Sequence, residues 1–225
     1  MFYVIIINKN NHTEVCLMSE IYVYDCLCQN CHIPFKNHAI LHNCVNCDIK
    51  NTVFNDFMSL SLNEVSCPLC KTKFTYEIPM IVISLKHKFV IKVNPSAFHN
   101  PIPTKQLPPF RILPPGFRFR EVYFMIEAVE KANIFLQGFE DVYIEHFKSL
   151  NFADDEALPF DEVNVVYTHS DDLFHYFVKY DSDNNPTEFF KKHKNSAEVD
   201  LNHFSDNKWY FINRVTIKNL LEKEN

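Results

Sequence analysis

Glycine is nearly absent from this chain of 225 residues, which contains only Gly116 and Gly138. Phosphate-binding loops of the P-loop and dinucleotide-binding types need several closely spaced glycines, so neither loop can be built here. The protease motif HExxH is also missing. The run Thr168 to Asp172 (THSDD) juxtaposes His, Ser and Asp, but neighbours in a strand point to opposite faces and catalytic triads join distant positions. We therefore expect a polar strand end there, and no enzyme.

Clustered positive charge is scarce as well. The formal net charge is −6, and the densest basic run is Lys191-Lys192-His193-Lys194. Proteins that bind nucleic acid through phosphates need clustered Lys and Arg, because that electrostatic attraction supplies most of the affinity. We interpret the run as a solvated loop or helix face, and nucleic acid is not the expected partner.

Long hydrophobic runs are lacking too. The apolar N-terminal run ends at Ile7, too short to cross a bilayer, and neither a basic region nor a small-residue cleavage site accompanies it. We read this run as a buried strand. The expectation is a soluble cytoplasmic protein with no membrane contact, whose thiols stay reduced.

The composition, with 47% hydrophobic and 15% aromatic residues, is typical of a globular protein. Apolar residues recur at helical spacing on both sides of Gly138, which predicts a helical hairpin over residues 119–135 and 139–150. We expect its Glu127, Glu130, Glu145 and Lys148 to be exposed, in pairs worth a few tenths of a kcal/mol. Strands are predicted at residues 2–7, 20–24, 75–84, 89–93, 164–168, 173–180 and 209–215. Between the last two we predict a long surface loop with a short helix, and a terminal helix over residues 216–225.

The cysteines carry the strongest chemical signal. Three CxxC pairs occur, at Cys28/Cys31, Cys44/Cys47 and Cys67/Cys70. Two intervening residues let both sulfurs of a tight turn point at one ion, at about 2.3 Å each, and a tetrahedral structural zinc site needs two such knuckles. We therefore predict a closed Zn²⁺ site rather than a catalytic one, which would have three protein ligands and an open position.

Two other uses of the cysteines are weaker. Disulfides are disfavoured because no secretory signal is visible. Redox catalysis at Cys67/Cys70 would need the first cysteine at a helix N-terminus, whereas the following residues KTKFTYEIP read as a strand.

Spacing leaves the choice of knuckles open. Cys44/Cys47 is separated from Cys67/Cys70 by residues 48–66, within the usual zinc-ribbon range, and Cys28/Cys31 is separated from it by residues 32–66. Spacing alone favours the middle pair.

Several stretches resemble the CpXC proteins, in which an N-terminal cysteine knuckle and a later CPxC knuckle flank a long insert that ends in a Leu-Asn segment. SLSLNEVSCPLC is similar to the approach to the second knuckle, and IPMIVISLKHKFVIKVNP to the strand pair after it. The hairpin FREVYFMIEAVEKANIFLQGFEDVYIEHFK is the most specific match. The residues that fall on the family's hairpin pattern are Arg120, Glu130, Lys131, Ile134, Phe135, Gly138, Asp141, Ile144, Glu145 and Lys148.

The resemblance implies that Cys28, Cys31, Cys67 and Cys70 are the metal ligands and that Cys44/Cys47 is a competing half-site inside the insert. The sequence departs from the family where the first knuckle lacks proline and where His32, Asp48 and Lys71 replace the glycine that commonly follows a knuckle. Cys44 and Cys47 could also complete a second site. The candidates for its other ligands are His38, His42, Cys16 and Cys26.

These expectations define an α+β protein with a zinc-ribbon-like N-terminal β part, a helical hairpin and a C-terminal β-rich part. The predicted divisions are a zinc-knuckle β domain (1–98), a Pro-rich connector (99–118), and the hairpin plus β-rich part (119–225) packed on the first domain. Metal binding should contribute on the order of 10 kcal/mol to folding if it behaves as in small zinc modules.

The leading functional hypothesis is a non-enzymatic, zinc-stabilised module whose partner is another protein. Two alternatives stay open. One is an intracellular immunity or antitoxin protein that blocks a basic toxin, which fits the net acidity. The other is a single-stranded nucleic-acid binder, because zinc ribbons with exposed aromatics sometimes stack bases.

Overall fold

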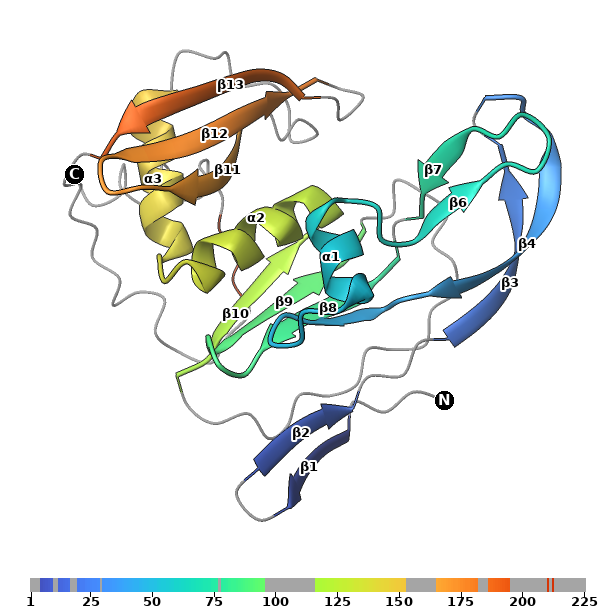
Figure 1. Cartoon of the computed structure of the whole chain (residues 1–225), viewed down its shortest axis with the longest axis horizontal. Helices are drawn as coiled ribbons and strands as arrows, with labels where there is room; N and C mark the ends of the chain where they lie inside the picture. Colours follow the sequence, from blue (N-terminus) through green and yellow to red (C-terminus); the bar gives the residue numbers. More distant parts are fainter. Residues whose placement is uncertain are drawn as a thin grey trace.

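The computed structural model describes residues 5–9, 12–16, 20–28, 30–76, 78–95, 116–152, 165–181 and 186–194, together with Tyr210 and Ile212. The predicted α+β class is confirmed (Figure 1). The strands of the N-terminal half are β1 (Ile5–Lys9), β2 (His12–Cys16), β3 (Glu20–Leu27), β4 (Pro34–Leu41), β5 (Cys44–Asn46), β6 (Glu64–Ser66), β7 (Lys73–Thr75), β8 (Met80–Ser84) and β9 (Phe89–Val93). The remaining elements are α1 (Thr52–Met58), β10 (Arg118–Val122), α2 (Met125–Leu136), α3 (Asp141–Asn151), β11 (Val165–Ser170), β12 (Phe174–Tyr180) and β13 (Pro186–His193).

Some predictions fall outside the described residues. These are the first part of the strand at 2–7, most of the Pro-rich connector, the strand at 209–215 apart from Tyr210 and Ile212, and the terminal helix. The strand predicted over residues 75–84 is wrong in its extent. It is divided into the end of β7 and β8, and Pro79, which has no N–H to donate to a ladder, lies between them.

A four-stranded sheet in the order β10-β9-β8-β5 forms the centre of the molecule. β8 and β9 are an antiparallel hairpin, while β10 joins β9 and β5 joins β8 in parallel. Both faces of the sheet are apolar, as is typical of strands covered on both sides. Val82 and Ile91 belong to the main core on one face, and Ile83 and Val90 to a smaller cluster on the other. The sheet therefore joins strands from either side of the predicted connector.

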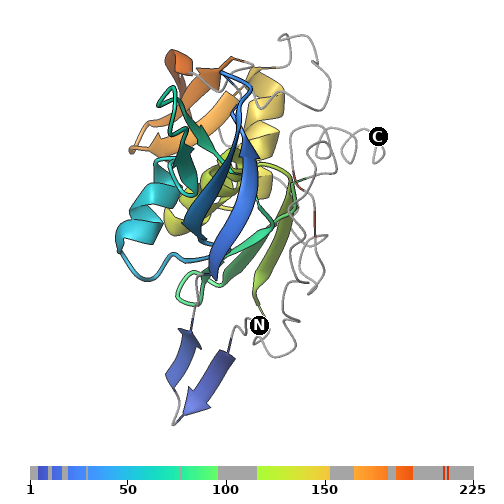
Figure 2. The same ribbon diagram turned by 90° about the vertical axis from the view of Figure 1, so that its right-hand side faces the viewer.

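The two hairpin helices form where the periodicity predicts them, and α2 packs against the central sheet (Figures 1 and 2). The ring of Phe135 in α2 lies 5.2 Å from that of Phe89 in β9, between ring centroids. Gly138 follows α2 with φ +82°, in the left-handed region that favours glycine, and its N–H donates to the carbonyl of Phe135. The turn then leads directly into α3.

A second, antiparallel sheet in the order β11-β12-β13 covers the side of the helices away from the central sheet. Phe177 of β12 stacks on Phe147 of α3, with the ring planes 5° apart and the centroids 5.9 Å apart. The helices therefore lie between two sheets, and the main core extends from the central sheet through α2 and α3 to β11 and β12.

β13 corrects two predictions. The long loop with a short helix, and the basic run as a loop or helix face, are wrong where β13 pairs with β12 from Pro186 to His193. Lys191 and Lys192 are therefore strand residues with side chains on opposite faces, and each lies over an aromatic ring, Phe174 and Phe152 respectively.

The β3–β4 hairpin and the short β6–β7 pair project together from the central body (Figure 1). We call this projection the arm. Among the described residues, no helix combines the length and apolar character needed to cross a membrane.

Candidate metal centre

The first knuckle lies at the turn of the β3–β4 hairpin. β3 ends at Leu27, and the chain turns at Cys28 to Cys31 before β4 begins. The N–H of His32 donates to the Cys28 carbonyl at 2.9 Å, and the N–H of Cys31 donates to Cys28 Sγ at 3.4 Å. His32 has φ +55°, the left-handed conformation that glycine adopts most readily.

The second knuckle has the same backbone geometry between β6 and β7. The N–H of Lys71 donates to the Cys67 carbonyl at 3.0 Å, and Lys71 has φ +63°. Cys67 follows a strand and precedes another strand, so it lacks the helix N-terminus that redox catalysis would need. His32 and Lys71 occupy the position where related knuckles commonly carry glycine, and the backbone keeps the left-handed turn without it.

The two knuckles bring four sulfurs together. One sulfur from each of Cys28, Cys31, Cys67 and Cys70 lies within 4.8 Å of all the others. Cys28 Sγ is 3.5 Å from Cys70 Sγ, and Cys31 Sγ is 3.8 Å from Cys67 Sγ. Four thiolates at about 2.3 Å from a tetrahedral ion would be about 3.8 Å apart, so this donor set fits one metal ion.

Hydrogen bonds favour thiolate character at one end of the cluster. The Thr72 hydroxyl lowers the pKa of Cys70 to about 5, with further help from the Thr72 backbone N–H. The backbone N–H groups of Cys70 and Leu69 also lower the pKa of Cys67. At Cys31 the backbone N–H of Ile33 lowers the pKa, but burial and the neighbouring sulfurs outweigh it and raise the pKa to about 12. A bound metal ion would displace the remaining thiol protons, because metal ions bind the thiolate form of cysteine.

The Leu-Asn segment before the second knuckle ties the arm to the body. Leu62 belongs to the main core, and Asn63 is buried with φ +63°. The Asn63 side chain accepts from the N–H of His42 at 2.7 Å and donates to the His42 carbonyl at 3.1 Å. The end of β4 is thereby fixed to the segment that leads into β6.

Cys44 and Cys47 do not form a knuckle, so the competing half-site is not assembled. Cys44 pairs with Ile81 and packs on the smaller apolar cluster, whereas Cys47 lies in the main core on the opposite face of the sheet. Burial raises the pKa of each thiol to about 12. Asp48, which follows Cys47, does not have the left-handed backbone conformation of His32 and Lys71. Its carboxylate accepts hydrogen bonds from the Ser84 hydroxyl at 2.6 Å and from the Leu85 N–H at 2.8 Å.

Two of the proposed additional ligands, His42 and Cys26, are described, and neither belongs to a group that could hold a metal ion. The backbone of His42 hydrogen-bonds with the Asn63 side chain, and Cys26 is buried. The side chains of Cys16 and His38 lie outside the described ones. Within the part of the chain that the structure describes, the four-cysteine cluster is the single group of this kind, and no disulfide joins the cysteines whose side chains are described.

The hairpin contains a second set of functional groups that the sequence prediction placed wrongly. Glu130, Glu145 and Lys148 are buried, not exposed, and Glu127 is partly buried. Glu130, Glu145 and Lys148 form, with three more charged residues, a continuous series of ion pairs that joins β10, α2 and α3. We call this series the buried charge chain, and its members in spatial order are Arg120, Asp141, Lys131, Glu145, Lys148 and Glu130.

The paired nitrogen and oxygen atoms of the buried charge chain lie close together. Arg120 donates to both carboxylate oxygens of Asp141, at 2.7 and 2.8 Å. Glu145 accepts from Lys131 at 2.6 Å and pairs with Lys148 at 3.0 Å. Lys148 reaches Glu130 at 2.9 Å, and Glu130 also accepts from the backbone N–H of Tyr167 in β11 at 2.6 Å.

The buried charge chain contains three positive and three negative side chains, so its charges balance. The pKa shifts of its members follow from burial and from the paired charges. Burial raises the pKa of Glu130, and the Lys148 charge opposes that effect only in part. At Glu145 burial acts in the same direction, but the two lysines outweigh it and lower the pKa. Helical spacing alone could not reveal this arrangement, although every member of the charge chain lies on the family's hairpin pattern quoted above.

The fold and the cluster define a class: an α+β protein in which two cysteine knuckles of zinc-ribbon type close a projecting β arm. The family model described as CpXC protein matches residues 26–148, which is more than half of the chain, and the chain belongs to this family. The match includes both knuckles of the cluster, the central sheet and the hairpin up to Lys148. Neither a curated protein nor a solved structure matches the chain.

Proposed function

We propose that the chain is a zinc-stabilised, non-enzymatic module of the cytoplasm that binds another protein through the end of its arm. The four-cysteine cluster carries this proposal. Four thiol donors from two knuckles are typical of structural Zn²⁺ sites, which leave no position for substrate. Soft sulfur ligands in tetrahedral arrangement also favour zinc over magnesium or calcium.

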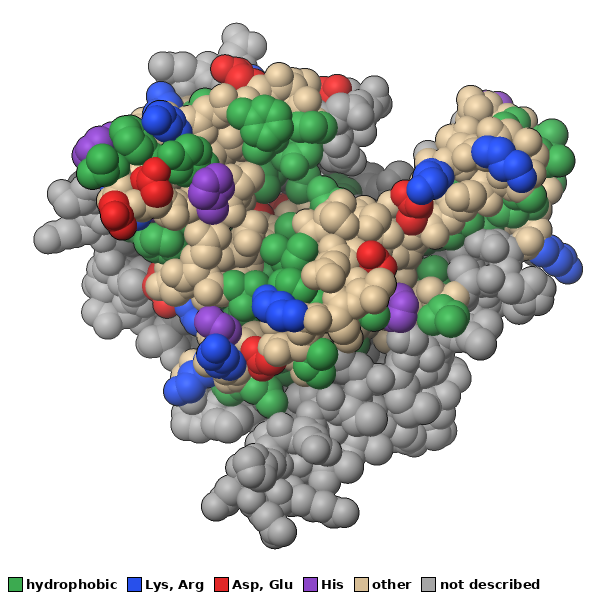
Figure 3. Space-filling model, viewed as in Figure 1, with side chains coloured by type: hydrophobic (Ala, Val, Ile, Leu, Met, Phe, Trp, Pro, Cys, Tyr) green, Lys and Arg blue, Asp and Glu red, His purple; other side chains and the backbone are tan. Residues whose placement is uncertain are grey.

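The surface around the cluster supports a protein partner. Three large apolar side chains lie within two residues of a cluster cysteine and face solvent. They are Leu27, Ile33 and Leu69, with exposed fractions of 60%, 45% and 60%. We call them the knuckle tip. Figure 3 shows hydrophobic side chains on the projecting arm. Exposed apolar groups that a rigid turn presents together are typical of protein interaction sites.

Metal content per chain, measured on variants in which each cysteine pair is changed to serine, tests the zinc site. We expect one zinc in the parent chain and none after C28S/C31S or C67S/C70S. The matched control is C44S/C47S, which removes a CxxC pair that the structure keeps apart, and it should retain the zinc. Retention of zinc by C28S/C31S would contradict the ligand assignment.

The interaction surface is tested with L27S/L69S, which leaves all four cysteines in place. We expect this variant to keep its zinc and its thermal stability but to lose proteins that the parent chain retains in quantitative affinity enrichment. The control is I49S, which changes a residue that is 50% exposed and follows β5 rather than the arm. An identical set of retained proteins for parent and L27S/L69S would show that the knuckle tip is not the interaction surface.

A specific feature of the second sheet favours one other candidate, a single-stranded nucleic-acid binder. On its outer face the His169 and Tyr176 rings stack at 4.3 Å with planes 5° apart, and Lys191 Nζ lies 4.3 Å from the centre of the Phe174 ring. Nearby Phe189 is 74% exposed. Figure 3 looks onto this face and shows hydrophobic, His and Lys side chains together over β11–β13.

Aromatic rings beside lysines stack unpaired bases, but the net charge of −6 weakens this candidate against the first. Fluorescence anisotropy with a labelled oligothymidylate at low salt separates the two. Binding that Y176A/F189A abolishes would favour the nucleic-acid role, and no binding at low salt would remove it.

A further inference from the structure

A cavity of about 590 Å³ opens between the turn that joins α2 to α3, the β8–β9 turn and the start of β10. The residues that line it are Lys86, His87, Lys88, Gly116, Phe117, Arg118, Arg120, Phe135, Gly138, Glu140 and Val142. We call it the basic cavity. Its volume lies within the range of about 300–1,000 Å³ that is typical of small-molecule sites. It is separate from the cysteine cluster, because none of its lining residues belongs to the arm.

The charge of the lining is unusual for this acidic chain. Four of the lining residues are Lys or Arg, and only one, Glu140, is acidic. The guanidinium of Arg120 is committed to Asp141. The side chains of Lys86 and Lys88, in contrast, have no acidic partner among the described residues, although the chain as a whole carries a charge of −6.

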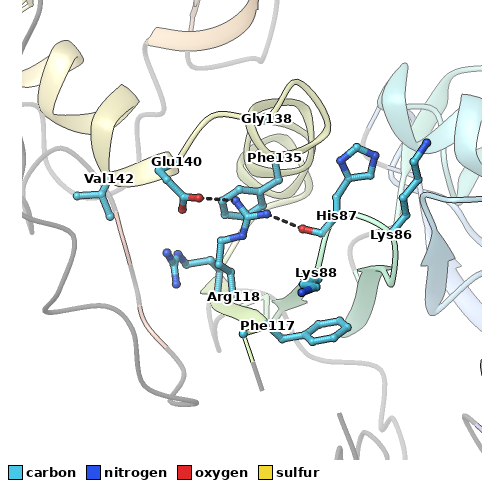
Figure 4. A pocket seen from close by; sticks show the side chains of 11 residues that line it. Lys86, His87, Lys88, Phe117, Arg118, Phe135, Gly138, Glu140 and Val142 are labelled. Atoms are coloured by element: carbon cyan, nitrogen blue, oxygen red, sulfur yellow. Dashed lines mark hydrogen bonds and ion pairs between the residues drawn. The ribbon is translucent and has the colours of Figure 1, made fainter. Parts of the chain in front are cut away.

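Arg118 is held rigidly in the middle of the cavity (Figure 4). It donates to Glu140 Oε1 at 2.8 Å on one side and to the His87 carbonyl oxygen on the other. Its Cζ lies 4.4 Å from the centre of the Phe135 ring. The Phe135 ring covers one face of the guanidinium, and 21% of the Arg118 side chain stays exposed, so part of it is accessible to a planar group of a ligand.

We propose that the basic cavity binds a small organic phosphate monoester with a planar ring. The ammonium groups of Lys86 and Lys88, for which the described residues supply no acidic partner, together match the charge of a phosphate monoester, which is about −1.5 to −2 near neutral pH. The ring of the ligand stacks on the exposed part of Arg118, which Phe135 and Glu140 keep in place. A carboxylate would neutralise only one of the two lysines.

The experiment uses the two glycines of the chain, both of which line the cavity. Selective labelling with ¹⁵N-glycine therefore gives two backbone amide signals, and both report on this site. The probe is phenyl phosphate, titrated into the full-length chain, with inorganic phosphate and benzoate in parallel. We expect both glycine signals to shift saturably with phenyl phosphate, and at least tenfold weaker binding for inorganic phosphate and for benzoate.

Variants then locate the charge. K86A/K88A should weaken phenyl phosphate binding at least tenfold, whereas K36A, which removes an exposed lysine from the arm, should leave it unchanged. The proposal is overturned if the glycine signals do not move, if K86A/K88A binds as the parent does, or if benzoate binds as tightly as phenyl phosphate.

Discussion

At the scale of single residues, the buried charge chain is the feature on which the hairpin depends most. A buried ion pair gains little over a well-packed apolar pair, because desolvation opposes the attraction between the charges. Removing one partner is different, because the other charge is then left without compensation in a medium of low polarity. Each charge of this series is therefore essential to the others.

E145Q tests this dependence. Lys131 and Lys148 both contact the Glu145 carboxylate directly. The amide of glutamine is close in shape to this carboxylate but leaves each lysine with one anionic partner fewer. We expect a loss of about 3–5 kcal/mol in the free energy of unfolding, measured by urea denaturation. The control E121Q breaks the partly exposed pair with Lys92 and should cost less than about 1 kcal/mol. Equal losses in the two variants would contradict the argument.

His175 makes a second prediction at this scale. The ring is buried among Phe139, Tyr143 and Phe147, and its Nδ1 lies 2.5 Å from the Ser170 hydroxyl. Burial lowers the pKa of His175 from 6.5 to about 4, and the charge of Lys194 acts in the same direction. The folded state therefore disfavours the protonated ring.

The sign of the pH dependence follows from this lowered pKa. The contribution of His175 to stability is fully present above pH 6.5 and is lost as the pH falls toward 4, because the unfolded chain takes up the proton first. Between pH 7 and pH 5 the loss from this residue should be about 2 kcal/mol. In H175F, which suits the aromatic surroundings, stability should fall by that much less over the same interval. Parallel pH profiles for parent and variant would show that His175 is not the responsible group, since His42 and His146 have lowered pKa values too.

At the scale of secondary structure elements, the sequence predicted the elements whose pattern reflects a single environment. The periodicity of α2 and α3 and the apolar runs of β8 and β9 located these elements to within a few residues. β13 could not be predicted in this way. It is an edge strand of the described sheet, and its polar residues on both faces conceal the alternation of a strand.

The error about the hairpin charges has a different cause. A charged residue at helical spacing is normally assigned to the solvent side, but α2 and α3 lie between two sheets and pack on each other. The side away from the central sheet is therefore buried as well, and Glu130 and Lys148 face each other there. Periodicity within one helix carries no information about what covers its second face.

The choice between knuckles also needed the structure, because spacing favoured Cys44/Cys47. The deciding property is backbone conformation. His32 and Lys71, which follow the two cysteine pairs of the cluster, are left-handed, whereas Asp48, which follows Cys44/Cys47, is not. A left-handed turn lets two sulfurs converge, and a strand that continues past Cys44 directs its neighbours to opposite faces.

This difference predicts the effect of restoring glycine. H32G removes the strain of a side chain in the left-handed region, about 1–2 kcal/mol, against a loss of chain entropy of about 0.5–1 kcal/mol. We expect a net stabilisation of up to about 1 kcal/mol for the zinc-bound chain, measured by denaturation. H32A keeps the side-chain strain and should give no gain. D48G should destabilise, because it removes a carboxylate that accepts from Ser84, Leu85 and Lys86.

At the scale of the whole molecule, two regions are stabilised by different means. The body contains the main core and the buried charge chain, which join the central sheet, the hairpin and the second sheet. The arm is a pair of two-stranded sheets, and isolated two-stranded hairpins are marginal in water. The cysteine cluster links the two hairpins at one end, and the Asn63 side chain links the end of β4 to the start of β6 at the other.

We therefore expect metal removal to release the arm and leave the body folded. This differs from small zinc modules, in which metal binding and folding are the same event, because the core of this chain does not include the cluster. The measurement is hydrogen–deuterium exchange with mass spectrometry, under reducing conditions, before and after treatment with a zinc chelator. Amides of residues 26–41 and 64–75 should exchange faster after chelation, while β8, β9 and α2 keep their protection. The C44S/C47S chain should respond in the same way, since its cluster is intact. Loss of protection in β8 and β9 together with the arm would show instead that the metal is required for the fold of the whole chain.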